Sequence, residues 1–131
     1  MSELTKSMIE HAKQVLGRAY APYSNFKVAS CLCSEDDRFF SGVNVENASY
    51  GLSICAESSA ICQMVAAGIQ KIKSIVVLNN QNTLCPPCGA CRQRIAEFST
   101  PDALIHLCNS ETVIKSMSIG ELLPEAFKFK P

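Results

Sequence analysis

The sequence predicts an α/β fold in three layers, α/β/α, with a single mixed sheet of about five strands. Three observations predict it. A pair of short strands comes early, and helices and strands alternate after that pair. A chain of 131 residues, 47% of them hydrophobic, can bury one core but is too short for two ordinary domains. We therefore expect residues 1–131 to form a single domain.

The first expected helix covers about four turns near the N-terminus. Its apolar residues recur at spacings of three and four, which is typical of a helix with one buried face; they are Leu4, Met8, Ile9, Ala12, Leu16 and Ala19. Ser2 stands at the N-cap position and Gly17 lies near the end. Pro22, within residues 21–25, then breaks the helix.

A hairpin is expected next. Residues 26–33 have the pattern of a strand with small side chains, the polar residues 34–37 form a turn, and residues 38–45 form the returning strand. Residues 46–53 are polar and contain Gly51, so we expect a loop there.

Helices and strands alternate over the rest of the chain. Residues 55–68 are rich in alanine and apolar almost all round, which predicts a buried helix. Residues 72–78 form a short apolar run typical of a strand covered on both faces. The remaining expected elements are a loop over 79–87, a helix over 88–98, strands over 103–108 and 112–117, and a short helix over 119–123.

The charges are balanced, with 12 basic and 12 acidic side chains. Phosphate binding needs a basic excess, so neither nucleic acid nor an anionic membrane is an expected partner. Charged residues make up only 18%, against about 25% in most globular domains, which favours surface hidden between subunits. No apolar run approaches the ~18 residues of a membrane span, and residues 1–11 lack the apolar core of a signal peptide. We therefore expect a cytoplasmic protein.

Three of the eight cysteines have the spacing of metal ligands. Cys55 starts one expected helix, and Cys88 and Cys91 open the next, three residues apart, so that their sulfurs lie on one side. Positive helix ends stabilise thiolates, and in a reducing compartment clustered cysteines more often hold metal than form bridges. The pattern predicts a Zn²⁺ site with three thiolate ligands.

Glu57 gives this predicted zinc site its chemistry. Three thiolates leave one tetrahedral position open, as catalytic zinc sites do, and zinc lowers the pKa of water there toward ~7. Glu57 lies two residues after the first ligand, where it is expected to take and return protons. Cys-x-Glu followed by Pro-Cys-x-x-Cys is a signature of zinc-dependent deaminases.

The alternative is a closed structural zinc site in a binding module without catalysis. Cys85 would then be the fourth ligand, since Cys85-Pro86-Pro87-Cys88 is also a Cys-x-x-Cys segment. This arrangement crowds three ligands into one short segment and leaves Glu57 without a role. The other cysteines are expected to be small core residues: Cys31, Cys33, Cys62 and Cys108. His11 and His106 are isolated, and structural roles are expected for both.

The chain resembles the cytidine deaminase family, specifically its small homotetrameric type with three cysteine ligands. Five segments in order along the chain carry the resemblance: Tyr23-Ser24-Asn25-Phe26-x-Val28, Asn44-Val45-Glu46-Asn47-Ala48, Cys55-Ala56-Glu57, Pro87-Cys88-Gly89-Ala90-Cys91-Arg92-Gln93, and Glu121-Leu122-Leu123-Pro124 followed by Phe127. The resemblance implies the family's fold and the hydrolytic deamination of free cytidine and 2′-deoxycytidine to uridine and 2′-deoxyuridine, with release of ammonia, in pyrimidine salvage. It also implies a homotetramer with one zinc per subunit and sites at the subunit interfaces.

The resemblance implies a role for each matching position. By this resemblance, Cys55, Cys88 and Cys91 bind zinc, and Glu57 shuttles protons. The backbone N–H of Ala56 meets the pyrimidine carbonyl oxygen, Phe26 packs against the base, and Asn44 and Glu46 hold the ribose hydroxyls. Residues from neighbouring subunits complete the pocket: Ala48, Tyr50 and Phe127. Other readings stay open for some of them. Phe26 also fits a core aromatic, Asn44 and Glu46 fit solvated hairpin residues, and Phe127 fits a loose tail aromatic.

One position departs from the family's pattern. Small tetrameric members usually carry Arg directly after the catalytic Glu, where it offsets the charge of three thiolates, whereas this chain has Ser58. We hypothesise that helix N-termini, hydrogen bonds from Ser58, and Arg92 compensate for it.

Two rival activities share the zinc motifs. A deaminase for a cytosine-bearing antibiotic such as blasticidin S lacks the Asn-Val-Glu-Asn segment, which is intact here at residues 44–47. A polynucleotide-editing deaminase needs a basic groove that follows phosphates, which a neutral chain does not offer.

Overall fold

The computed structural model describes residues 1–129, so residues 130–131 of the predicted domain lie outside the described range. The elements in chain order are α1 (Glu3–Leu16), β1 (Val28–Ser34), β2 (Phe39–Val43), the 3₁₀ turn η1 (Tyr50–Leu52), α2 (Ala56–Ala66), β3 (Ile72–Asn79), α3 (Gly89–Phe98), β4 (Ser99–Cys108), β5 (Val113–Ser118) and α4 (Ile119–Leu122). Within residues 1–129, none of the helices has the length and apolarity that crossing a bilayer requires.

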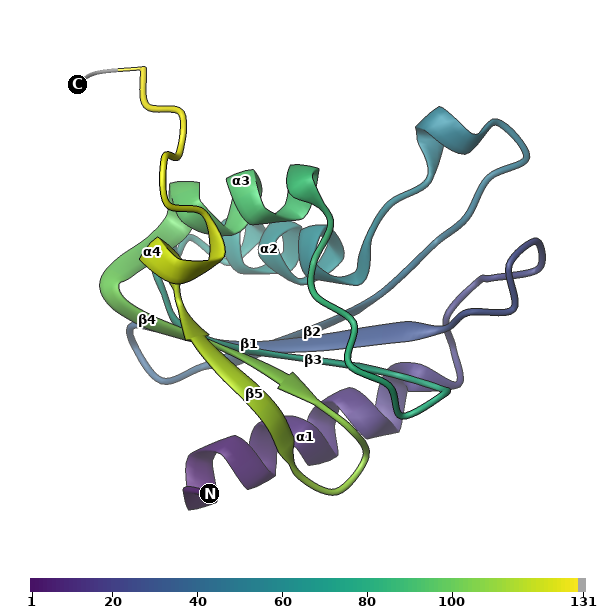
Figure 1. Cartoon of the computed structure of the whole chain (residues 1–131), viewed down its shortest axis with the longest axis horizontal. Coiled ribbons are helices and arrows are strands. Elements are labelled where there is room, and N and C mark those ends of the chain that lie inside the picture. Colours follow the sequence, from purple (N-terminus) through teal and green to yellow (C-terminus); the bar gives the residue numbers. More distant parts are fainter. Residues whose placement is uncertain (130–131) are drawn as a thin grey trace.

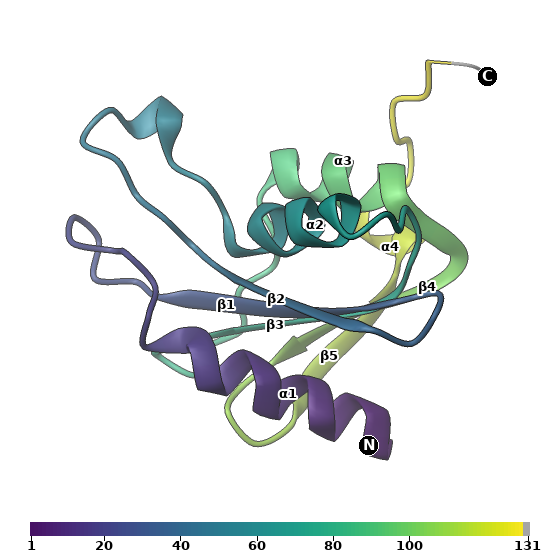
Figure 2. The ribbon, with the colours of Figure 1, turned by 180° about the vertical axis from the view of Figure 1, so that it is seen from behind.

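The five strands form the single mixed sheet that the sequence predicts, and their order is β2-β1-β3-β4-β5. β3 and β4 are parallel, and the other neighbouring pairs are antiparallel. The parallel pair is joined through α3, because parallel neighbours need a crossover connection. α1 covers one face of the sheet, and α2, α3 and α4 cover the other, which gives the predicted three layers (Figures 1 and 2).

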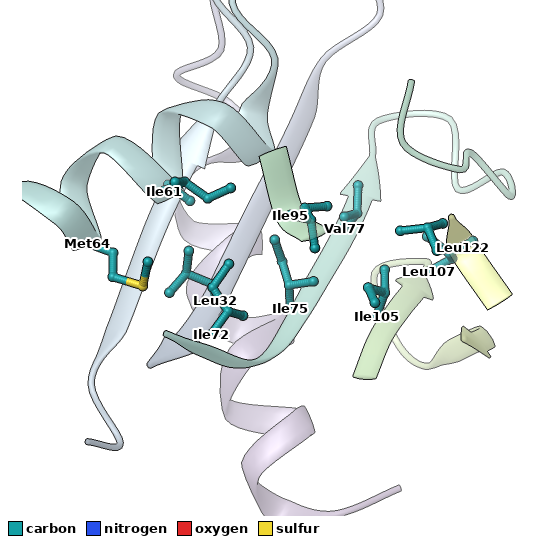
Figure 3. Close-up of a cluster of buried hydrophobic side chains, with 11 residues drawn as sticks. Leu32, Ile61, Met64, Ile72, Ile75, Val77, Ile95, Ile105, Leu107 and Leu122 are labelled. Carbon is teal, nitrogen blue, oxygen red and sulfur yellow. The ribbon is translucent and has the colours of Figure 1, made fainter. Parts of the chain in front are cut away.

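Two cores form because successive side chains of a strand point to opposite faces. On β1, Leu32 faces α2 and α3, whereas Cys31 and Cys33 face α1. On β3, the residues facing α2 and α3 include Ile75 and Val77 (Figure 3). The N-terminal helix closes the second core with Met8, Ile9 and Ala12, and its N-cap is the predicted one, since the Ser2 hydroxyl accepts a hydrogen bond from the Thr5 N–H at 3.1 Å.

The start of β4 differs from the prediction. The strand begins at Ser99, four residues before the expected residue 103, and Ser99 pairs with Ile72 before the next pair forms at Ser74 and Leu104. The register shift between these two pairs accommodates Pro101, which has no N–H to give to a ladder. The predicted start of β4 is therefore too late, because Pro101 is atypical of a strand and is tolerated here only at the register shift.

The prediction that the second helix is buried all round is wrong for this chain. Cys62 and Val65 of α2 are exposed, so Cys62 is not the core residue that the sequence predicts. The other three predicted core cysteines are buried, and burial raises the pKa of Cys31 to about 11 and that of Cys108 to about 12. These thiols therefore stay neutral at physiological pH, as core residues do.

The two isolated histidines make local contacts, as predicted. His11 lies 2.8 Å from the Ser7 carbonyl oxygen through Nδ1 and packs edge-on against Phe39. His106 pairs with Ser116 across β4 and β5 at 2.7 Å. Neither belongs to the group of possible metal ligands found within residues 1–129.

One end of the sheet collects the segments that form the candidate site. Two loops, before β1 and around η1, project beyond that end, and α2 and the segment leading into α3 begin there (Figures 1 and 2). α2 lies very close to β2 at Gly42, where a Cβ atom would stand 2.5 Å from the Ala60 nitrogen and 2.6 Å from the Ala56 carbonyl oxygen. Glycine at this position therefore sets how closely the first turn of α2 approaches the sheet.

Candidate active site

The three predicted zinc ligands come together at two helix N-termini. Cys55 is the N-cap of α2, Cys88 is the N-cap of α3, and Cys91 lies in the first turn of α3. Their three sulfurs lie within 4.8 Å of one another, and the sulfurs of Cys55 and Cys88 are 3.7 Å apart. Thiolates 2.3 Å from a tetrahedral zinc ion are about 3.8 Å apart, so the trio fits this ion.

Cys85 lies outside this sulfur group. Among residues 1–129 the group has three members, and Cys85 instead faces the cavity beside them. Burial and the nearby Glu57 carboxylate both raise the pKa of Cys85. The arrangement favours a site with an open fourth position over the closed four-cysteine alternative.

The three thiols ionise unequally because their charges interact. Hydrogen bonds from the Cys55 thiol and from Ser58 lower the pKa of Cys91 to about 5. The hydrogen bond to Cys91 and burial raise the pKa of Cys55. Because neighbouring thiolates repel one another, a cation is needed to hold three of them together.

Glu57 is a buried carboxyl beside the sulfurs. It lies on the first turn of α2 and is only 4% exposed. Burial, followed by the negative charge of Cys91, raises its pKa to about 7. A carboxyl with this pKa can both accept and donate a proton near neutral pH.

A cavity of about 520 Å³ opens over Glu57 and two of the three sulfurs. Its volume lies in the range of small-molecule sites. Of the predicted site residues, the cavity brings together Asn44, Glu46, Tyr50, Cys55, Ala56, Glu57 and Cys88. Cys91 joins them from below through the sulfur group.

Phe26, Ala48 and Phe127 do not line this cavity in the isolated chain. Phe26 is half-buried at the start of the strand region, and Ala48 is exposed. Phe127 is 72% exposed, and its backbone is held to α3 by two hydrogen bonds with the Gln93 side chain, at 3.1 and 3.4 Å. Tyr50, which the resemblance assigns to a neighbouring subunit, lines the cavity of its own chain and is 80% exposed.

Asn44 and Glu46 hold the loop before β1. The Asn44 amide donates to the Phe26 carbonyl and accepts from the Val28 N–H, each at 2.9 Å. The Glu46 carboxylate accepts from the N–H groups of Tyr23 and Ser24 at 3.0 and 3.2 Å, and also from the Ser24 hydroxyl. The hydrogen bond from that hydroxyl is the main cause of the lowered pKa of Glu46.

Several cavity residues had no role in the sequence prediction, among them Tyr23, Ser24, Val28, Ile54 and Val77. The first three belong to a segment that the resemblance had marked, so the signal was present in the chain. Ile54 and Val77 carry no local signal, because strand pairing and the turn before α2 bring them to the cavity.

The arginine next to the sulfurs is a different one from the arginine that the sequence indicates. The Arg92 guanidinium donates to the carbonyls of Pro87 and Leu122 at 2.8 and 3.1 Å, which fixes the loop before α3 to α4. Arg94 donates through Nη1 to the Ser58 hydroxyl at 3.0 Å, and that hydroxyl lies 3.4 Å from the Cys91 sulfur. Arg94 follows Cys91 by three residues, which places both on one side of α3.

The chain belongs to the family described as the cytidine and deoxycytidylate deaminase zinc-binding region, which matches residues 2–107. The predicted family is thereby confirmed, together with a zinc-binding character that the three-thiol group fits.

Proteins named cytidine deaminase are similar to this chain over nearly its whole length. The cytidine deaminase of Mycoplasma genitalium is 41% identical over 122 residues, which cover 92% of this chain and 93% of that protein. The crystal structure of cytidine deaminase from Burkholderia pseudomallei is 43% identical with a TM-score of 0.87, and the match covers 97% of this chain and all of that one. The structure from Mycobacterium tuberculosis matches at 31% identity and a TM-score of 0.84, over 98% and 100% of the two chains. These matches confirm the predicted fold.

Proposed function

We propose that this chain is a zinc-dependent hydrolase that converts cytidine and 2′-deoxycytidine to uridine and 2′-deoxyuridine and releases ammonia. The observation that carries the proposal is the placement of a buried carboxyl, Glu57, beside three converging thiols at the floor of the cavity. The names of the relatives support the choice of substrate.

Cys55, Cys88 and Cys91 would hold one zinc ion per subunit. When bound, the ion would supply an activated water molecule to the reaction. Cys55 and Cys88 stand at the N-caps of α2 and α3, where the positive ends of the helix dipoles would stabilise thiolates.

Glu57 moves the protons of the reaction. It accepts a proton from water as the new C4–O bond forms and delivers a proton to N3 of the base. It then takes the proton of the new C4 hydroxyl group and passes it to the amino group on C4, so that the C4=O bond forms as the C–N bond breaks and ammonia leaves. Overall, one water is consumed and one ammonia is released. Its pKa of about 7 suits a group that must act as base and as acid within one turnover.

The base and the sugar would be held by residues around the cavity. The Ala56 N–H lies at the first position of α2, where it has no partner within the helix and is free for the pyrimidine carbonyl oxygen. The side chains of Asn44 and Glu46 would take the ribose hydroxyls, and each retains hydrogen-bonding capacity beyond its contacts to the loop. Phe26 would pack against the base.

A homotetramer would complete the pocket. Its support is the exposed apolar surface of the isolated chain, which includes Val65 on α2, Tyr50 in the projecting loop and Phe127 near the C-terminal end. Ala48, Tyr50 and Phe127 would then contribute to sites at subunit interfaces, with Tyr50 reachable from its own chain as well. Because three thiols must stay reduced to bind metal, a reducing compartment such as the cytoplasm suits the protein, in pyrimidine salvage.

The experiment that tests this function is the loss of cytosine absorbance when zinc-loaded enzyme is added to cytidine or deoxycytidine. We expect turnover of both nucleosides and its loss on adding a chelator. Glu57→Gln should keep fold and zinc while turnover falls by ~10²–10⁴-fold, as for loss of a general acid–base group. Blasticidin S serves as the competing substrate. A preference for it by orders of magnitude, or the absence of cytidine turnover in zinc-loaded wild type, would overturn the proposal.

A further inference from the structure

A chain of two contacts links a surface arginine to one sulfur of the metal site. Arg94 on α3 donates through Nη1 to the Ser58 hydroxyl at 3.0 Å, and the Ser58 oxygen lies 3.4 Å from the Cys91 sulfur. Ser58 is buried, although Arg94 itself is exposed over much of its length. The Ser58 hydroxyl lies within hydrogen-bonding distance of Cys91, and hydrogen bonding by Arg94 also lowers the pKa of Cys91.

The chemistry of the groups fixes the direction of these two contacts. A guanidinium has donors only, so the Ser58 oxygen must accept from Arg94. The single hydroxyl hydrogen of Ser58 is then free to point at Cys91, and a metal-bound thiolate can only accept it. Donation from Arg94 also polarises the hydroxyl, which strengthens its donation to sulfur.

The charge of the site requires such a contact. Three thiolates carry three negative charges, and Zn²⁺ cancels only two of them. The hydrogen bonds of the Arg92 guanidinium within residues 1–129 go to two backbone carbonyls, those of Pro87 and Leu122. Arg94 is the cation that the structure connects to the trio.

We propose that Arg94 is a positioning residue that stabilises the metal-bound thiolate of Cys91 through the hydroxyl of Ser58. The inference rests on the proposed zinc site. It assigns the compensating charge to a residue of α3, on the side of the trio away from the cavity. The hollow around Arg94 is lined largely by apolar side chains, including Ile61, Val65 and Phe98.

The test is the rate at which zinc-loaded protein gives up its metal to an excess of a chromogenic chelator. Removing an outer partner of a metal ligand typically costs 10–100-fold in metal affinity. We expect Arg94→Gln and Ser58→Ala each to speed zinc release by about tenfold. The double variant should release zinc within about twofold of the faster single variant, because both changes break the same link.

A second readout separates this role from a merely structural one. With Co²⁺ in place of zinc, loss of the hydrogen bond to Cys91 should shift the thiolate-to-cobalt charge-transfer band to longer wavelength. Arg38→Gln is the matched control. This substitution removes the same charge. Arg38 also donates a hydrogen bond near α2, to the backbone carbonyl of Ala67 beyond the end of that helix. Arg38 lies at the β1–β2 turn, however, and this turn is at the other end of the hairpin from Val28 and Asn44. The zinc release and cobalt band of Arg38→Gln should match those of wild type.

Arg94→Gln releasing zinc at the wild-type rate, or effects that multiply in the double variant, would overturn the inference. Should Arg94→Gln fail to fold, Arg94→Met replaces it, because it removes the same donors and keeps an unbranched side chain. Zinc release is measured without substrate. A wild-type protein that binds zinc but does not convert cytidine would therefore contradict the proposed function without contradicting this inference.

Discussion

Glu46 shows how one carboxylate at the surface can organise a loop. It accepts hydrogen bonds from two consecutive N–H groups and from the hydroxyl of Ser24, so residues 23 and 24 are held against the start of the projecting segment. The same carboxylate lines the cavity. Its ionised form is therefore needed twice, for the shape of the loop and for the proposed contact with ribose.

We predict that the anchor of this loop fails in acid. The folded-state pKa of Glu46 lies below its ordinary value of 4.5, so the stabilisation is fully present above pH 4.5 and is lost as pH falls through the lowered pKa. In an NMR titration, the amide signals of Tyr23 and Ser24 should move together with a midpoint below 4.5. In Glu46→Gln they should not move over that range. A midpoint at or above 4.5 would contradict the assignment.

At the residue scale, the sequence was enough to predict the three possible metal ligands and Glu57, but not the arginine that contacts them. The cysteine spacing and the helix starts were enough to place the three sulfurs together, because both ligand segments are short and local. Neighbouring residues in the sequence do not determine whether Arg92 or Arg94 lies next to the sulfurs. That depends on which side of α3 faces Ser58 and which faces the carbonyl of Leu122, and only the packed helices determine this.

At the scale of elements, the contact of α2 with β2 sets the position of the metal ligands. Gly42 has no room for a side chain, since a Cβ atom would meet the backbone of α2 at Ala56 and Ala60. The first turn of α2 carries Ala56 and Glu57, directly after Cys55. We therefore expect a side chain at Gly42 to push Glu57 and Cys55 away from the other two sulfurs.

We predict that Gly42→Ala costs about 1–3 kcal/mol of folding stability through overpacking and weakens zinc binding at the same time. Urea unfolding and zinc titration measure the two effects. Gly17→Ala is the control, because its Cβ would meet nothing within 4 Å and its backbone is already helical. Unchanged zinc affinity in a destabilised Gly42→Ala protein would show that α2 adjusts without moving the ligands.

The hydrophobic patterns predicted the elements well where one face is buried and poorly where the pattern is interrupted. The helix at residues 3–16 follows from its periodicity, and the strand at residues 72–79 follows from its short apolar run. The start of β4 does not, because Pro101 stands at a register shift that no single-chain pattern reveals. For a different reason, the exposure of one side of α2 was not predicted. Apolar residues on a helix indicate that a surface is covered, but they do not show whether the same chain or another chain covers it.

For the whole molecule, that exposed side predicts where copies of the chain meet. Cys62, Val65 and Phe98 lie together with Arg94 around one hollow on the outside of α2 and α3. Burying such a surface would also explain the low content of charged residues. The prediction that residues 1–131 form one domain stays a prediction.

We predict that Val65→Asp weakens self-association, because a carboxylate in a closed apolar contact loses its hydration. Sedimentation should show wild type as four chains and the variant as two or one. Ile114→Asp on β5 makes the same chemical change at another exposed position and should leave the assembly intact. A Val65→Asp protein that sediments like wild type would place the subunit contact elsewhere.

The position of the sulfurs in the chain has a consequence for the lifetime of the protein. Cys55 and Cys88 are 33 residues apart, and the intervening segment contains α2 and β3. An ion held by both closes this stretch into a ring in the same way that a covalent bridge would, and so reduces the freedom of the denatured chain. Scarcity of the metal would then shorten the survival of the folded molecule against proteases, independently of its effect on turnover.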